Sequence, residues 1–175
     1  MSVKVKLRIK ATITDLVLAG KYSASAMNGF FTAENGNVYA IDKLNDMCSD
    51  VIEYTAWGEY SEEQGNCVIR YTENPDIGYA GCITTLIFSP ENRGALIMTR
   101  DGEISTAARF DMKEKRQHCR YETPIIPVEF AINTRSVHNT VDSGSGAILL
   151  DYNIEVRGVN TERNRLFIEV QGYDG

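Results

Sequence analysis

One segment of the sequence places an acid, a base and a phenol close together. Residues 68–72 have the composition of a strand, Arg70 lies within it, and Glu73 follows it directly. Side chains alternate between the two faces of a strand, so Tyr71 and Glu73 share one face and Arg70 lies on the other. An unpaired carboxylate inside a protein costs several kcal/mol, so an inward-facing Glu73 must accept hydrogen bonds. Whether the strand continues to Glu73 or ends just before it, we expect this carboxylate at the rim of the core or just inside it.

Two further tyrosines are candidate partners of this carboxylate. Tyr152 falls on the apolar face of the clearest strand, which spans residues 148–156, so its ring should point inward. A buried phenol needs a hydrogen-bond partner, and Tyr121 and an arginine from another strand are further available donors. The candidate site therefore consists of Tyr71, Glu73, Tyr121 and Tyr152. These residues form either a polar network that fixes the core or a network that binds a small ligand inside the barrel or at its mouth.

The sequence offers few residues for other kinds of chemistry. His118 and His138, the two histidines, lie where we expect exposed positions, so neither is predicted to be catalytic. No CxxC pair and no phosphate-binding glycine motif occurs, so no metal and no cofactor is predicted. We expect the four cysteines to be free thiols packed as small apolar residues: Cys48, Cys67, Cys82 and Cys119.

The overall composition is that of a soluble globular protein. The chain has 175 residues, of which 43% are hydrophobic and 24% charged. The net charge of −6 makes nucleic acid an improbable partner, because a nucleic-acid-binding surface needs a basic field. No apolar run approaches the roughly 18 residues of a membrane span, and the N-terminus lacks the apolar run of a signal peptide. We expect a cytoplasmic protein without a membrane contact.

Two basic segments keep one interaction hypothesis open. Lys4, Lys6, Arg8 and Lys10 lie on one face of the first strand, and residues 113–120 are also rich in basic side chains. The sequence favours an ordinary solvated strand face, whose lysines also discourage edge-to-edge aggregation. If the first strand pairs with the last, acidic residues of the last strand offset part of this charge. Binding to RNA or to an acidic protein remains the alternative.

Period-two alternation dominates the chain and predicts the fold class. Clear apolar stripes occur in residues 3–9, 128–132, 148–156 and 166–170, with polar residues between them. We count about ten strands joined by short turns, with antiparallel neighbours and little helix. So many antiparallel strands hide their edges by closing into a barrel or by packing as two sheets, and periodicity alone leaves both open.

Local turn signals add two specific predictions. Asp101-Gly102 predicts a two-residue hairpin turn with positive φ, in which Arg100 lies opposite Glu103 and forms an exposed ion pair with it. This would make Arg100 a structural residue outside the site. Residues 29–41 also have the pattern of a hairpin, whereas residues 15–27 are ambiguous between a strand and a short helix.

The order of motifs from residue 50 onward resembles the YwiB-like family, small bacterial proteins of unknown function with a calycin-like, lipocalin-type β-barrel. The resemblance covers residues 50–171 and implies a single all-β domain over 1–175 with about 8–10 antiparallel strands. It supplies no catalytic residues, because the family has no established activity. It rests on these segments, in order: 55–60 (TAWGEY), 69–73 (IRYTE), 84–87 (TTLI), 100–102 (RDG), 121–124 (YETP), 149–152 (LLDY) and 164–168 (NRLFI).

The sequence departs from the family pattern at two places. Ile125-Ile126-Pro127 follows the Thr-Pro turn where the family has a glycine soon after it. About thirty-five extra residues, 15–49, separate the first strand from the family-like portion, and a segment that long usually carries structure of its own.

Three functions follow from these observations. The favoured interpretation is a binding module without enzymatic activity that holds a small molecule in the barrel. The second is an interaction protein that contacts RNA or a protein through its basic strands and the segment 15–49. The third is an enzyme that uses carboxylate and tyrosine acid–base chemistry. A hollow interior would favour the first, a filled interior the second, and a cleft with perturbed carboxylates the third.

Overall fold

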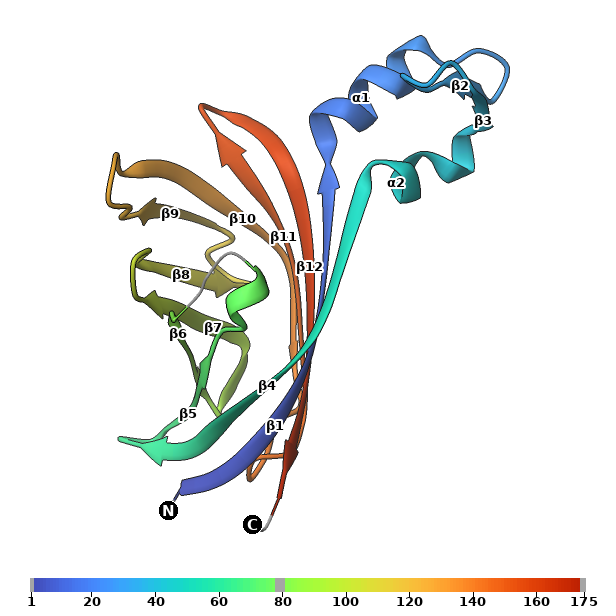
Figure 1. The fold of residues 1–175 in the computed structure, drawn as a ribbon. Coiled ribbons are helices and arrows are strands. Elements are labelled where there is room, and N and C mark those ends of the chain that lie inside the picture. Colours follow the sequence, from blue (N-terminus) through green and yellow to red (C-terminus); the bar gives the residue numbers. More distant parts are fainter. Residues whose placement is uncertain (1, 78–80, 174–175) are drawn as a thin grey trace.

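The computed structural model describes residues 2–77 and 81–173 (Figure 1). In these residues, ten strands form one antiparallel sheet in the order β8-β7-β6-β5-β4-β1-β12-β11-β10-β9. The strands are β1 (Ser2–Asp15), β4 (Ser49–Glu63), β5 (Asn66–Thr72), β6 (Ile83–Ser89), β7 (Asn92–Asp101), β8 (Thr106–Asp111), β9 (Arg116–Tyr121), β10 (Val128–Asn139), β11 (Gly146–Val156) and β12 (Val159–Gly172). The predicted all-β antiparallel fold is confirmed.

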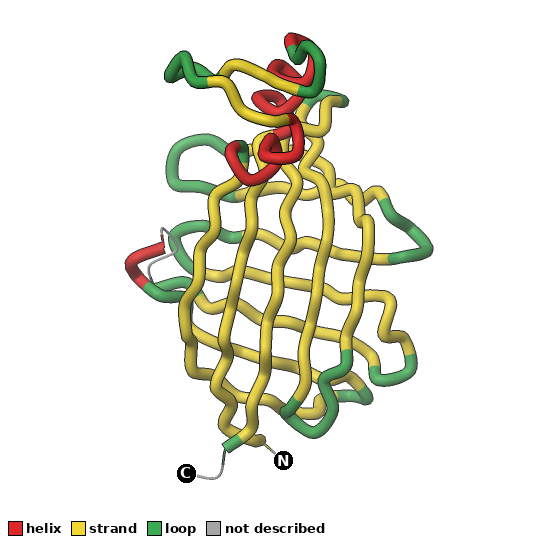
Figure 2. The backbone as a smooth tube through the Cα atoms, turned by 90° about the vertical axis from the view of Figure 1, so that its right-hand side faces the viewer, coloured by secondary structure: helices red, strands yellow, loops and turns green. Residues whose placement is uncertain are grey.

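The sheet curls until its two outermost strands, β8 and β9, come together (Figure 1), so the barrel is nearly closed. In the side view, strands at the front and the back of the barrel cross one another (Figure 2). Ser105 and Glu122, which flank these strands, exchange backbone N–H···O hydrogen bonds of 3.0 and 2.8 Å. In the middle of the sheet, β1 pairs with β12, the last strand, which is the condition under which acidic residues offset the basic face of β1. Arg8 lies opposite Glu169 there, and their side chains form an exposed ion pair of 3.7 Å.

The core lies on the inner face of the sheet, where the apolar stripes predicted it. Val5, Leu7 and Ile9 of β1 are 0–3% exposed, and the alternating lysines and Arg8 face outward. Ile148 and Leu150 of β11 are equally buried. Burial of each such side chain stabilises the fold by about 1.5–3 kcal/mol, so the register of β1 and β11 is strongly specified.

Residues 16–48 form a separate unit, the arm, which projects from the ends of β1 and β4 (Figure 1). It contains α1 (Leu16–Ser25), β2 (Phe30–Thr32), β3 (Val38–Ala40), the 3-10 turn η1 (Ile41–Lys43) and α2 (Leu44–Met47). The ambiguous segment is thus a helix, and the predicted hairpin is confirmed as β2–β3.

Local capping explains why the chain becomes helical after β1. The side chain of Asp15 accepts a hydrogen bond of 2.9 Å from the backbone N–H of Leu18, which satisfies one of the donors left free at a helix start. The arm has a small core of its own, in which Tyr22 of α1 stacks on Phe31 of β2 with ring centroids 5.3 Å apart. None of the helices formed by the described residues has the length and hydrophobicity needed to cross a membrane.

The prediction of a two-residue turn at Asp101-Gly102 is wrong. Arg100 pairs with Thr106 rather than Glu103, so residues 101–105 form a longer connection. The bridge between Ser105 and Glu122 explains this, because it takes Ser105 away from β7 and joins the two edges of the barrel. Gly102 does not have a positive φ; a Cβ there would lie 2.6 Å from the Sγ atom of Cys82, so close approach requires the glycine.

A second close approach gives a test of the register between β4 and β5. Gly58 lies opposite Tyr71, and a Cβ on Gly58 would lie 2.9 Å from the Tyr71 Cβ and closer still to the backbone oxygen of Arg70. We expect Gly58→Ala to lower the free energy of unfolding by about 1–3 kcal/mol, measured by urea denaturation, because the backbone must shift.

The matched control is Gly20→Ala in α1, where no described atom lies within 4 Å of the added Cβ. Alanine is the better helix former by about 1 kcal/mol, so this variant should be as stable as the parent chain or more stable. Equal losses for the two alanine variants would contradict the close approach at Gly58.

Candidate functional site

Glu73 lies just past the end of β5 and points into the barrel. Its side chain is 1% exposed, and its backbone N–H donates to the Cys82 oxygen at 2.9 Å. This hydrogen bond continues the pairing of β5 with the segment that leads into β6. The expectation of a carboxylate just inside the rim, held by hydrogen bonds, is therefore confirmed.

The carboxylate of Glu73 receives donors from neighbouring strands. The Tyr54 hydroxyl of β4 donates to Oε2 at 2.7 Å, and the Thr84 hydroxyl of β6 donates to Oε1 at 2.5 Å. The Arg100 Nε atom of β7 lies 3.6 Å from Oε1. Tyr71, which is 3% exposed, lies in hydrogen-bonding contact with Thr84 and Tyr54. The buried charge is thus compensated by hydroxyl donors and a guanidinium.

Arg70 takes the opposite side of the strand, as the alternation predicts. Its guanidinium donates two hydrogen bonds, of 2.6 and 3.0 Å, to the carboxylate of Glu63 on the protein surface. These bonds, with a further one from Ser61, lower the pKa of Glu63 to about 2. The acid and base that stand close together in the sequence therefore belong to separate pairs, one buried and one exposed.

The other two predicted residues lie around Arg100. The Tyr121 ring stacks on Phe130 with centroids 5.1 Å apart, and its hydroxyl accepts a hydrogen bond of 3.4 Å from Arg100 Nη1. The Tyr152 ring packs against Phe110 with centroids 4.7 Å apart. Arg100 thus connects Tyr121 to the network of Tyr71 and Glu73, and Tyr152 lines a small internal cavity together with Arg100 and Tyr121. Whether these residues bind a ligand stays a prediction.

That internal cavity has a volume of about 30 Å³. Arg100, Thr106, Tyr121 and Tyr152 contribute to its wall. Within residues 2–77 and 81–173, the buried hydroxyl oxygen of Thr106 has no hydrogen-bond partner. A space of this size, with a few polar groups in a mostly apolar wall, fits about one water molecule. It is roughly tenfold smaller than the clefts that hold organic ligands.

The sequence missed Tyr54, Thr84 and Arg100 as members of the network. Arg100 was assigned to a surface ion pair by the local turn rule, which the long-range bridge of Ser105 overrides. A signal for Tyr54 exists, because it shares strand parity with Ala56 and Tyr60, both buried.

The electrostatics of the site keep the phenols of Tyr54 and Tyr71 protonated. Burial raises the pKa of Tyr54 well above 10, and the neighbouring Tyr71 and Glu73 add to the shift. Burial and then the charge of Glu73 raise the pKa of Tyr71 in the same direction. Phenols of this kind donate hydrogen bonds and do not act as bases at neutral pH. Among the described residues, no group of three or more His, Cys, Asp or Glu side chains could hold a metal ion.

Comparison with known proteins agrees with this fold. Residues 37–168 match the family model described as a domain of unknown function, DUF1934. The chain belongs to the DUF1934 family.

Comparison with solved structures tests the predicted resemblance to the YwiB-like family. The structure is similar to the crystal structure of YwiB protein from Bacillus subtilis, with a TM-score of 0.68 and 18% sequence identity. The match covers 99% of this DUF1934 chain and 94% of the other chain. The resemblance to a YwiB-like family with a barrel fold is confirmed. A search of curated proteins found no match.

The buried pair of Glu73 and Arg100 can be compared with the exposed pair of Glu63 and Arg70. We expect Glu73→Gln to lower the free energy of unfolding by about 3 kcal/mol, because it leaves a largely buried guanidinium without its counter-charge. Glu63→Gln should leave the urea midpoint nearly unchanged, because water screens the exposed pair. Similar midpoints for the two glutamine variants would show that the Glu73 network does not stabilise the barrel.

The raised pKa values of Tyr54 and Tyr71 give a pH dependence with a definite sign. Above about pH 10 these phenols ionise in the unfolded chain but stay protonated in the folded one. The unfolded state then binds fewer protons, so stability is complete below about pH 10 and falls as the pH rises further. Urea midpoints measured from pH 9 to above pH 11 should show this fall, and Tyr54→Phe should make it shallower. An unchanged slope in that variant would contradict the shift.

Proposed function

We propose that this DUF1934 protein is an interaction module whose arm docks onto a partner protein. One observation carries the proposal: large apolar side chains of the arm are exposed at a distance from the barrel. A second observation supports it: the internal cavity has a volume of about 30 Å³, which makes the barrel interior too small for an organic ligand.

The apolar residues gather on one face of the arm hairpin. Phe31 and Tyr39 face α1, and Phe30 and Val38 face the other way. Phe30 is 52% exposed and Val38 64% exposed. Met27, 75% exposed, exchanges backbone hydrogen bonds of 2.8 and 3.0 Å with Phe30 and so lies next to it. We call Met27, Phe30 and Val38 the arm patch. Exposed apolar clusters of this kind mark surfaces that bind other proteins.

The charges of the arm favour a protein over a nucleic acid. Residues 16–48 carry two basic side chains, Lys21 and Lys43, and three acidic ones, Glu34, Asp42 and Asp46. A surface with that balance offers no basic field to phosphates.

The basic face of β1 is also a poor binding surface for RNA. Lys10 pairs with Glu53 at 3.4 Å, Arg8 pairs with Glu169, and Lys6 lies 5.4 Å from the centre of the Trp57 ring. These contacts occupy part of the basic face, which supports the interpretation of that face as an ordinary strand surface.

For Tyr71, Glu73, Tyr121 and Tyr152 we propose the structural interpretation, an internal network that fixes the end of the barrel. The raised pKa of the Tyr71 phenol and the paired carboxylate of Glu73 support this role over ligand binding or acid–base catalysis. The four cysteines are buried and free, which fits the predicted cytoplasmic location.

Site-specific photo-crosslinking in cells of the source organism tests the proposal. A photoreactive residue in place of Val38 should give a discrete adduct with one protein, because the arm patch would be covered by the partner. Introducing Phe30→Glu into the same chain should abolish the adduct, because a charge would be buried in the interface. Phe30 is exposed in the free chain, so the urea midpoint should not change.

A matched control uses Ile125, which is 88% exposed in the connection between β9 and β10. A photoreactive residue there should give no discrete adduct. The same adduct from both positions, or none from Val38, would overturn the assignment of the arm patch.

A further inference from the structure

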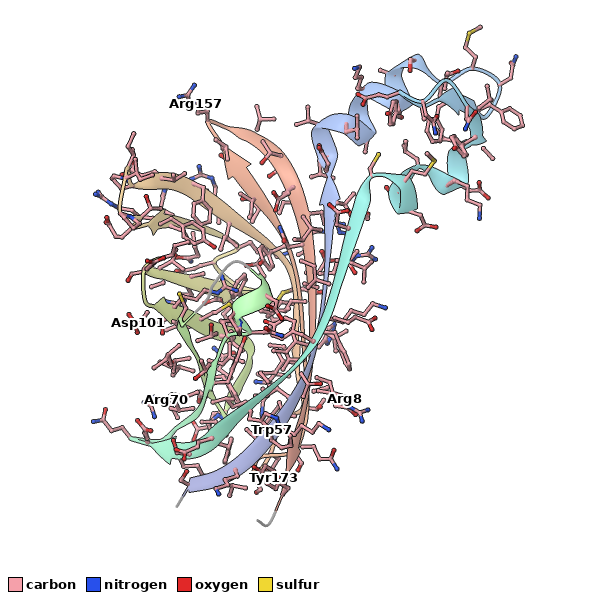
Figure 3. The ribbon with its side chains drawn as sticks, viewed as in Figure 1. Arg8, Trp57, Arg70, Asp101, Arg157 and Tyr173 are labelled. Atoms are coloured by element: carbon pink, nitrogen blue, oxygen red, sulfur yellow. The ribbon has the colours of Figure 1, made fainter. Side chains whose placement is uncertain are left out.

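A groove of about 490 Å³ runs along the outer face of the sheet beside α2 of the arm. The arm leans toward the side on which Arg8 projects from β1, so it overhangs this outer face (Figure 3). We infer that the groove binds a small amphipathic organic anion, a molecule with an aryl or acyl body and one acidic headgroup. This inference is independent of the arm patch, which lies on the hairpin of the arm.

The floor of the groove is apolar although it faces away from the core. Phe167 of β12 and Leu149 of β11 lie directly opposite each other in the ladder and are 38% and 44% exposed. Val51 of β4, 56% exposed, also lines the groove. Exposing aromatic and aliphatic side chains to water is unfavourable, and an acyl or aryl group in the groove would cover them.

Polar donors border this floor. Lys10 lies opposite Phe167 on one side, and His138 lies opposite Leu149 on the other. Arg165 precedes Phe167 by two residues and so shares its face. Ligand sites of this kind combine an apolar surface with a few convergent polar groups that fix the orientation of the ligand.

The charge balance of the groove favours an anion. Two carboxylates also line it, Asp46 and Asp151. Asp151 already accepts hydrogen bonds of 2.9 and 2.6 Å from Arg163, and Arg135 lies 3.6 Å away. Arg165 lies opposite Asp151 in the ladder. Arg163, then Arg135 and Arg165, lower the pKa of Asp151, so three arginines surround one carboxylate and positive charge is in excess there.

The basic residues of the groove have less compensation. In the described part of the chain, no carboxylate oxygen lies within 4.0 Å of the Arg165 guanidinium. Within the described ranges, Lys10 forms one ion pair, an exposed pair with Glu53, which a ligand headgroup could replace at little cost. Arg165 and Lys10 are therefore the headgroup contacts that we assign.

The volume of the groove agrees with a small molecule. Organic ligands occupy clefts of roughly 300–1,000 Å³, and the groove falls within that range. The internal cavity of about 30 Å³ does not.

Titration of the full-length chain with 8-anilinonaphthalene-1-sulfonate, an aryl sulfonate whose fluorescence rises in apolar surroundings, tests the inference. We expect saturable binding with one probe per chain. Leu149→Glu, which puts a charge on the floor, and Arg165→Glu, which reverses the headgroup contact, should each weaken binding about tenfold or more. Both side chains are exposed, so urea midpoints should stay close to that of the parent chain.

Arg157→Glu is the matched control, because Arg157 is an exposed arginine at the turn between β11 and β12, outside the groove (Figure 3). It changes the net charge by the same amount as Arg165→Glu and should leave the affinity for the probe unchanged. Dodecanoate should displace the probe, whereas dodecanol, with the same chain and no charge, should displace it poorly.

Three results would overturn the inference. The first is the absence of saturable probe binding. The second is an equal loss of affinity in Arg157→Glu and Arg165→Glu, which would show a response to net charge alone. The third is equally efficient displacement by dodecanol and by dodecanoate, which would show an apolar surface without a headgroup contact.

Discussion

The cost of burying the charge of Glu73 constrains the arrangement of this end of the barrel. A carboxylate that is 1% exposed has to be compensated, and the compensation comes from Tyr54, Thr84 and Arg100. These partners lie on β4, β6 and β7, so the network fastens the strands around the point where the chain leaves β5. Removing one partner of such a network is costly because the remaining groups stay buried. The network therefore specifies one register here.

The sequence predicted what local alternation determines. The stripes in β1 and β11 identified inward residues because one face of each strand is buried, and the same parity placed Tyr71 and Glu73 on a common face. It failed where a distant contact decides the geometry. Arg100 has a local context typical of a tight hairpin, but β7 pairs it with Thr84 of β6 and places it on the inward face beside Glu73. Partners on other strands cannot be read from local periodicity, so the donors of the network were found only in part.

The arm shows the same division between local and distant information. The hairpin of residues 29–41 was predictable because Gly36 adopts a φ of 83°, which glycine tolerates. The helix α1 was ambiguous because its apolar residues cover only part of one face, and its capping by Asp15 becomes visible only when the backbone turns after β1. The packing of Tyr22 on Phe31 then gives the arm a core that the separate segments do not reveal.

Because the interior of the barrel is filled, the outer surfaces of this fold are the candidates for binding. The internal cavity holds about one water molecule, so the barrel can serve as a rigid support for the surfaces that it positions. The arm patch and the outer groove involve different parts of the same arm. Asp46 of α2 borders the groove, whereas the hairpin carries Phe30 and Val38. The arm is anchored to the barrel by the ladder of β1 with β4, which continues to the pair Thr14 and Ser49 at its base. Any ligand in the groove would contact both the sheet and the arm, so groove and patch share one supporting element.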